Sequence, residues 1–136
     1  MWVYYAVLSA FFASLTALFA KVGVKGVDTD LATAIRTVVI LLLAWGIVFF
    51  RGKGTFVGLT RFNLLFLVLS GVATGLSWIF YFKALQLGKV SQVAPIDKLS
   101  VALTILLGVL ILREPVTVKE VVGAVMIIGG SLVMVL

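Results

Sequence analysis

The sequence contains no cysteine and no histidine. Without cysteine the chain has no disulfide bond, no thiolate nucleophile and no thiolate metal ligand. Without histidine it lacks the usual proton shuttle at neutral pH and the commonest metal ligand. No apolar stretch carries a pair of acids that could act as acid and base. We therefore expect no enzymatic activity, no metal site and no cofactor.

Charged side chains are also scarce. They make up 12% of the 136 residues, whereas 63% are hydrophobic, and a soluble domain carries about 25% charged residues. A soluble protein of this size could not bury so much apolar surface. A net charge of +6 would suggest nucleic acid in a soluble protein. Here the Lys and Arg residues lie mostly at the ends of apolar runs, so contact with the lipid bilayer explains them and no nucleic-acid partner is expected.

Five apolar stretches are long enough to cross the hydrocarbon layer, which takes about 20 residues of helix. They cover approximately residues 2–21, 31–50, 62–82, 92–112 and 118–136. The bilayer interior leaves no water for open backbone groups, so helices are the expected spanning elements. We predict an all-α integral membrane protein, multi-pass in a cell membrane, in which residues 1–136 form one domain as a bundle of five transmembrane helices.

The fourth stretch is the most unusual, because its first third holds Pro95, Asp97 and Lys98. A charge near the bilayer centre costs about 2.5–3.5 kcal/mol on insertion scales. Pro95 removes a backbone donor and can break the helix, and broken helices line substrate sites in many transporters. Alternatively, Pro95 lies in the first turn, where proline is tolerated, and the charges are shallower. Adjacent residues do not face each other on a helix, so we expect Asp97 and Lys98 each to have a partner elsewhere.

Three further residues complete the candidate site for substrate binding or coupling. Arg36 lies about five residues inside the second stretch, where it either snorkels to the interface or is buried. A buried Arg favours a carboxylate partner, and Asp97 is the only acid well inside a stretch. Trp78 and Tyr81 lie three residues apart, on one helix face. They line a cavity or form an interfacial belt, and the belt suits Tyr81 better.

Small residues predict where helices approach one another closely. Gly71 and Gly75 form a GxxxG motif in the third stretch, and Gly123 and Gly130 lie in the fifth stretch. In apolar helices such residues mark packing faces. We expect close helix contacts at these four positions, with a subunit contact as one option for the fifth stretch.

Several of these features occur together in a known family. They are Arg36 in the second stretch, Tyr81-Phe-Lys-Ala-Leu85, Ala94-Pro95, Glu114, and Gly123 with Gly130. This pattern resembles the EamA-type domain of the drug/metabolite transporter superfamily over essentially the whole chain. Common members are ten-span exporters of amino acids and other metabolites, built from two such domains in opposite orientation. The resemblance implies a secondary transporter that exports small metabolites. It assigns no role to Asp97 and Lys98, whose role rests on the cost of burial.

The loop charges do not favour either orientation in the membrane. Five cations lie on the N-terminal side: Arg51, Lys53, Arg61, Arg113 and Lys119. Four lie on the opposite side: Lys21, Lys25, Lys83 and Lys89. The positive-inside rule then gives no clear bias, and two oppositely inserted copies would reproduce an inverted repeat. We predict an antiparallel homodimer of dual topology in a prokaryotic inner membrane, with parallel copies or a sister chain as alternatives.

The candidate site is compatible with more than one function. Arg36, Asp97 and Lys98 sum to a charge of +1, which suits an anionic or zwitterionic solute such as an amino acid. In a non-transporting membrane subunit, the same charges would fix helix register. A flippase for a lipid head group is the third reading.

Overall fold

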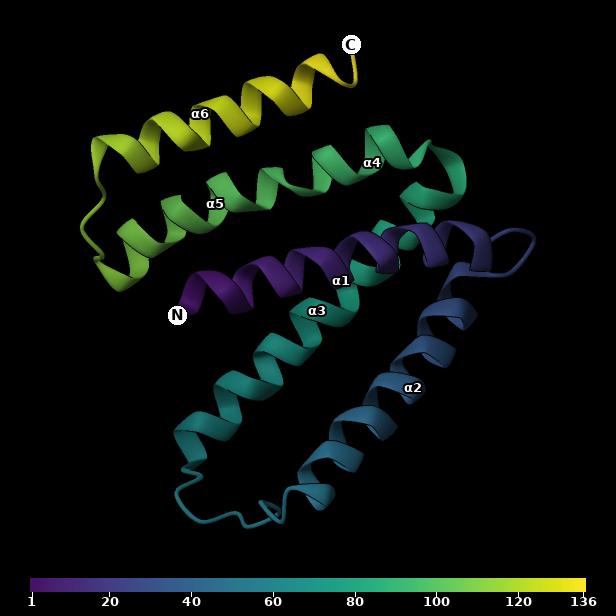
Figure 1. Cartoon of the computed structure of the whole chain (residues 1–136), viewed down its shortest axis with the longest axis vertical. Coiled ribbons are helices and arrows are strands. Elements are labelled where there is room, and N and C mark those ends of the chain that lie inside the picture. Colours follow the sequence, from purple (N-terminus) through teal and green to yellow (C-terminus); the bar gives the residue numbers. More distant parts are fainter. The chain divides into compact units, whose positions relative to one another are not determined.

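The computed structural model describes residues 1–136, and every regular element in it is a helix (Figure 1). The elements are α1 (Trp2–Gly23), α2 (Thr29–Phe50), α3 (Arg61–Leu87), α4 (Val90–Asp97), α5 (Leu99–Leu107), the π-helix η1 (Gly108–Leu112) and α6 (Val118–Val133). The predicted all-α fold is confirmed, because no strand is present.

Four stretches of helix are long and apolar enough to cross a membrane: Trp2–Gly23, Thr29–Phe50, Arg61–Leu87 and Val90–Leu112. The fifth helix, α6, has 16 residues, which corresponds to about 24 Å of helix against a hydrocarbon layer of about 30 Å. Its end lies earlier than the predicted residue 136, because the last amides close tight turns, as from Val135 N–H to the Leu132 carbonyl. The third helix runs further than the predicted residue 82, to Leu87.

Local hydrogen bonds explain where several helices begin. Asp28 caps α2, since its carboxylate accepts from the amides of Asp30 and Leu31, both at 3.0 Å. Thr117 and Glu120 form a capping box at the start of α6. These side chains satisfy amides that have no partner within the first turn of a helix. The helix starts are therefore encoded locally.

The chain divides into two compact units, Phe19–Gln86 and Met1–Leu18 with Leu87–Leu136. In the Phe19–Gln86 unit, the buried side chains gather where the ends of α1, α2 and α3 meet. Val24, Phe82 and Leu85 are at most 2% exposed. The Gln86 side chain donates to the carbonyls of Val24 and Val27, both at 2.8 Å. These two bonds tie the end of α3 to the loop between α1 and α2.

In the other unit, α4 and α5 lie along α6 (Figure 1). The hydroxyl of Ser131 on α6 is buried and donates to the carbonyl of Pro95 on α4 at 2.9 Å. The helix is interrupted directly after this point, since α4 ends at Asp97 and α5 begins at Leu99. One hydroxyl therefore ties α6 to the turn that precedes the interruption.

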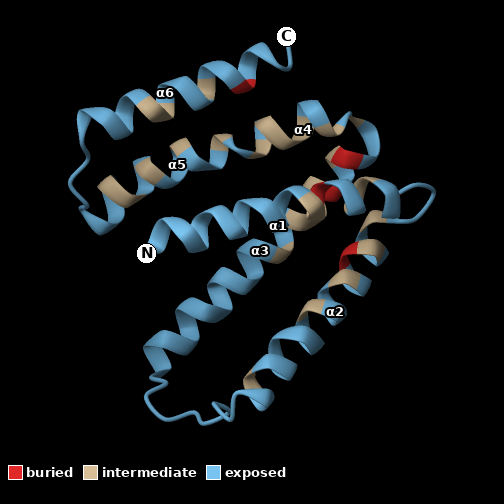
Figure 2. Cartoon of the chain, viewed as in Figure 1, coloured by how far each residue is buried: buried red, intermediate tan, exposed pale blue.

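Most of α2 and α3 is exposed, as Figure 2 shows, and many of the exposed side chains are large and apolar. The close contacts predicted at Gly71, Gly75, Gly123 and Gly130 are not found within either unit, because a Cβ added at any of them would meet nothing within 4 Å. The buried contacts of α3 lie further along the helix, at Phe82 and Leu85. Close helix packing at these glycines therefore stays a prediction, with a subunit contact as one option for Gly123 and Gly130.

Candidate functional site

Arg36 lies on the one face of α2 that is turned away from solvent. The partly or fully buried residues in the first half of α2 are Thr29, Ala32, Thr33, Arg36 and Ile40. Their spacing of three, four and seven residues places them on a single helix face. Arg36 is the eighth residue of α2, about 10 Å along the helix from its start. A half-buried cation therefore lies inside a helix that can span the membrane.

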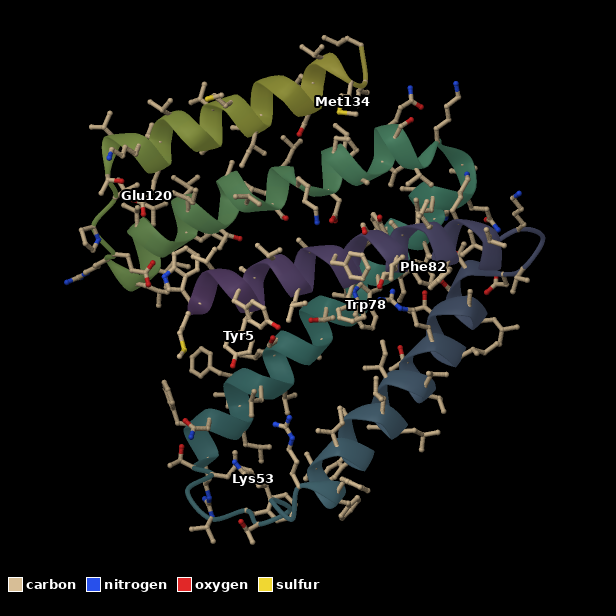
Figure 3. The ribbon with its side chains drawn as sticks, viewed as in Figure 1. Tyr5, Lys53, Trp78, Phe82, Glu120 and Met134 are labelled. Carbon is tan, nitrogen blue, oxygen red and sulfur yellow. The ribbon has the colours of Figure 1, made fainter.

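The guanidinium of Arg36 stacks on two aromatic rings of α3. Its carbon lies 4.0 Å from the ring centroid of Trp78 and 5.1 Å from that of Phe82. Trp78 and Phe82, both labelled in Figure 3, are four residues apart and so share a helix face. Both distances are within the range of about 6 Å for cation–π attraction. The aromatic face of α3 thus holds the cation without neutralising it.

Within the Phe19–Gln86 unit, no carboxylate pairs with Arg36. The one ion pair in the structure joins Asp97 and Lys98, which belong to the other unit. A guanidinium carries five donors in a planar fork that matches a carboxylate or phosphate. The guanidinium carbon lies over the Trp78 ring, and an aromatic ring uses none of these donors as a carboxylate would. The arrangement can therefore bind a small anionic group.

Tyr81 lies beside this pair on α3. It is half-buried, and its ring centroid is 6.5 Å from that of Phe82. Trp78 is also half-buried. The structure thus brings together three of the predicted site residues, Arg36, Trp78 and Tyr81, within the Phe19–Gln86 unit. It adds Phe82, which the sequence reading had not singled out although its spacing of four from Trp78 was visible.

Asp97 and Lys98 belong to the other unit, where they pair with each other. Their charged groups are 3.5 Å apart, and the side chains are 38% and 56% exposed. The expectation that each needs a partner elsewhere is wrong, because it assumed a continuous helix. Lys98 lies in a tight turn between α4 and α5, with φ −71° and ψ −9°, and at this local departure from the regular α-helix the two neighbouring side chains converge. A pairing between Arg36 and Asp97 would join the two units, and it stays a prediction.

Pro95 is the sixth residue of α4, beyond the first turn in which proline is readily tolerated. Its carbonyl accepts from the Lys98 amide at 3.1 Å as well as from the Ser131 hydroxyl. The sequence reading missed Ser131. The available signal was that Ser131 is the only polar side chain of α6 after Glu120, in an otherwise apolar run.

Comparisons with known proteins agree with this architecture. A model of the EamA-like transporter family matches residues 1–136. A relative from a Sinorhizobium species, described as an uncharacterized transporter in the cobO 3′ region, is 47% identical over 137 aligned residues, which cover 98% of this chain and 95% of the relative. An uncharacterized protein of Methanocaldococcus jannaschii is 31% identical over 71 residues, 52% of each chain. No solved structure matches.

The family match covers the whole chain, and the first relative is similar over nearly its full length. Four stretches of helix are apolar enough to cross a bilayer. The chain therefore belongs to the EamA-like transporter family and is a multi-pass membrane transporter of the drug/metabolite superfamily.

Proposed function

We propose that this chain is a secondary transporter that exports small anionic or zwitterionic metabolites such as amino acids. In this proposal Arg36 binds the carboxylate of the solute, and Trp78 with Tyr81 forms the wall behind it. The observation that carries the proposal is the guanidinium of Arg36, whose carbon lies 4.0 Å from the Trp78 ring centroid with no carboxylate of its own unit paired with it.

The energetics favour an anionic partner. A cation in a membrane span costs about 2.5–3.5 kcal/mol on insertion scales. Stacking on an aromatic ring stabilises the cation by about 1–2 kcal/mol, which is less than the cost of inserting it. A carboxylate that accepts two hydrogen bonds from the guanidinium offsets the remainder. Arg36 therefore gains more from a negatively charged solute than from a neutral or positive one.

Asp97 is the proposed coupling residue. Its carboxylate is paired with Lys98 at the interruption between α4 and α5. Broken helices place polar groups and open backbone at the sites of many transporters. We propose that Asp97 exchanges its ion pair for a proton or for the amine of the solute, and that Pro95 creates the break that makes this exchange possible.

The proposed assembly is an antiparallel homodimer in a prokaryotic inner membrane, with residues 1–136 as one transmembrane domain of each subunit. Two observations support it. The loop cations are nearly balanced between the two sides, so the positive-inside rule imposes no single orientation. Large apolar side chains along α2 and α3 are exposed, which leaves surface for both lipid and a second copy.

Export from proteoliposomes tests the role of Arg36. The liposomes are loaded with a radiolabelled amino-acid mixture, and export is measured with and without a pH gradient. We expect Arg36→Gln to lower export at least tenfold and Arg36→Lys to lower it less, because Lys keeps the charge but not the fork. Lys83→Gln is the matched control, since Lys83 is an exposed cation of α3. Export by Arg36→Gln at the control rate would exclude this role.

Single cysteines test the orientation, because the chain contains no cysteine of its own. Gly54→Cys reports on the N-terminal side of the membrane, since an added Cβ there meets only ordinary contacts at 3.9 Å. Gly88→Cys suits the other side, since Gly88 lies between α3 and α4 and its replacement leaves the loop cations unchanged. When whole cells are treated with an impermeant thiol reagent, about half of the molecules should be labelled at each of the two sites. Full labelling at one site and none at the other would rule out dual topology.

A further inference from the structure

We propose that the end of α2 and the loop after it form a binding site for the phosphate head group of an anionic phospholipid. The site is a hollow of about 170 Å³, several times the ~30 Å³ that one water molecule occupies. It lies within the Phe19–Gln86 unit. Its lining residues are Ala44, Trp45, Val48, Lys53, Gly54, Thr55 and Phe56.

The end of α2 holds the loop in place through a local hydrogen-bond motif. The Lys53 amide donates to the Val48 carbonyl at 3.2 Å, and the Gly52 amide donates to the Phe49 carbonyl at 3.0 Å. Gly52 has φ +62°, the left-handed conformation that glycine adopts without strain. These are the bonds of a Schellman motif. The backbone of Lys53 is thereby fixed against the last turn of α2, at the rim of the hollow.

The charge around the hollow is of one sign. Lys53 is the charged residue of the lining, Arg51 and Arg61 flank the loop in the sequence, and no acidic residue occurs between Asp30 and Asp97. Clustered basic residues next to a membrane helix attract anionic lipid head groups. Charge complementarity therefore favours an anion in the hollow.

The apolar part of the lining favours a lipid over a soluble anion. Trp45 is 42% exposed and Phe56 is 72% exposed, and Val57 beside the hollow is 91% exposed. Tryptophan is enriched at the level of the lipid head groups, where its ring is apolar and its N–H is polar. Leu41 precedes Trp45 by one helical turn and is also exposed. An acyl chain can thus continue along α2 from a phosphate held near Lys53.

Quenching of Trp45 fluorescence by brominated lipids tests the proposal. A Trp2→Phe/Trp78→Phe background leaves Trp45 as the one tryptophan. The full chain is reconstituted in phosphatidylcholine vesicles that contain either brominated phosphatidylglycerol or brominated phosphatidylcholine at equal mole fraction. We expect stronger quenching by the phosphatidylglycerol. This comparison needs no change at position 53, and equal quenching by both lipids would overturn the proposal.

A variant then assigns the preference to Lys53. Lys53→Gln should lower the preference for phosphatidylglycerol about fivefold, the effect expected of one Lys near an anionic surface. Lys83→Gln, an exposed cation elsewhere in the unit, should leave it unchanged. An unchanged preference in Lys53→Gln would overturn the proposed site. Inorganic phosphate at constant ionic strength should not reduce the quenching, and a reduction would assign the hollow to a soluble anion instead.

Discussion

The contact between Arg36 and Trp78 can be measured without knowing the transported solute, by a double-mutant cycle on stability. The cycle uses Arg36→Met, Trp78→Leu and the double variant. The single substitutions are difficult to interpret alone. Arg36→Met removes a half-buried charge and so relieves its desolvation, whereas Trp78→Leu also loses packing. The interaction term of the cycle cancels both effects and leaves the contact itself.

The expected size of that term follows from the geometry. The guanidinium carbon is 4.0 Å from the Trp78 centroid, and both side chains are half-buried. Cation–π pairs contribute about 0.5–1 kcal/mol when exposed and about 2 kcal/mol when desolvated. We therefore expect a coupling free energy of about 1 kcal/mol. Part of the attraction persists in Trp78→Leu, because Phe82 also faces the cation at 5.1 Å.

The assay is reversible unfolding by dodecyl sulfate in mixed micelles, followed by circular dichroism. Arg36→Met combined with Phe66→Leu is the control cycle. Phe66 lies on the same helix, about 18 Å from Trp78 by the helical rise, and distant pairs are additive within about 0.5 kcal/mol. A coupling for Arg36 and Trp78 no larger than that of the control would refute the stacked arrangement, and with it the proposed anion site.

Three further predictions concern other contacts. Gln86→Met should lower the free energy of unfolding by about 1–2 kcal/mol in the same assay, because two loop carbonyls lose a donor. Gln92→Met is the control and should have little effect, because Gln92 is exposed and its side chain makes no hydrogen bond. Asp97→Asn should abolish export driven by a pH gradient while circular dichroism remains that of the folded protein; export that still follows the gradient would remove Asp97 from the mechanism. Ser131→Ala should lower the free energy of unfolding by about 0.6 kcal/mol, the average for hydrogen bonds between membrane helices. It should also speed amide hydrogen exchange in α4, because the Pro95 carbonyl loses its bond to α6; unchanged exchange would show that the Ser131 hydroxyl does not stabilise the Pro95 turn.

The sequence by itself determined that the protein is a helical membrane protein and where most of its helices lie. These properties depend on composition and on interactions between residues close in the chain. The long apolar runs predict α1, α2 and α3 because lipid offers no partner to open backbone groups. The cap of α2 is likewise a local feature, since the Asp28 carboxylate bonds amides only two and three residues away. The family was also recognisable from the sequence, and the match over residues 1–136 confirms it.

Only the tertiary structure decided how the polar groups are paired. Arg36 stacks on Trp78, and Gln86 bonds to carbonyls about 60 residues earlier in the chain. Asp97 pairs with Lys98 because the helix is interrupted there, a geometry that a rule for continuous helices excludes. Such pairings depend on where one helix lies against another and on small departures from regular helix. Long apolar runs specify which segments enter the membrane, but they do not specify which side chains meet inside it.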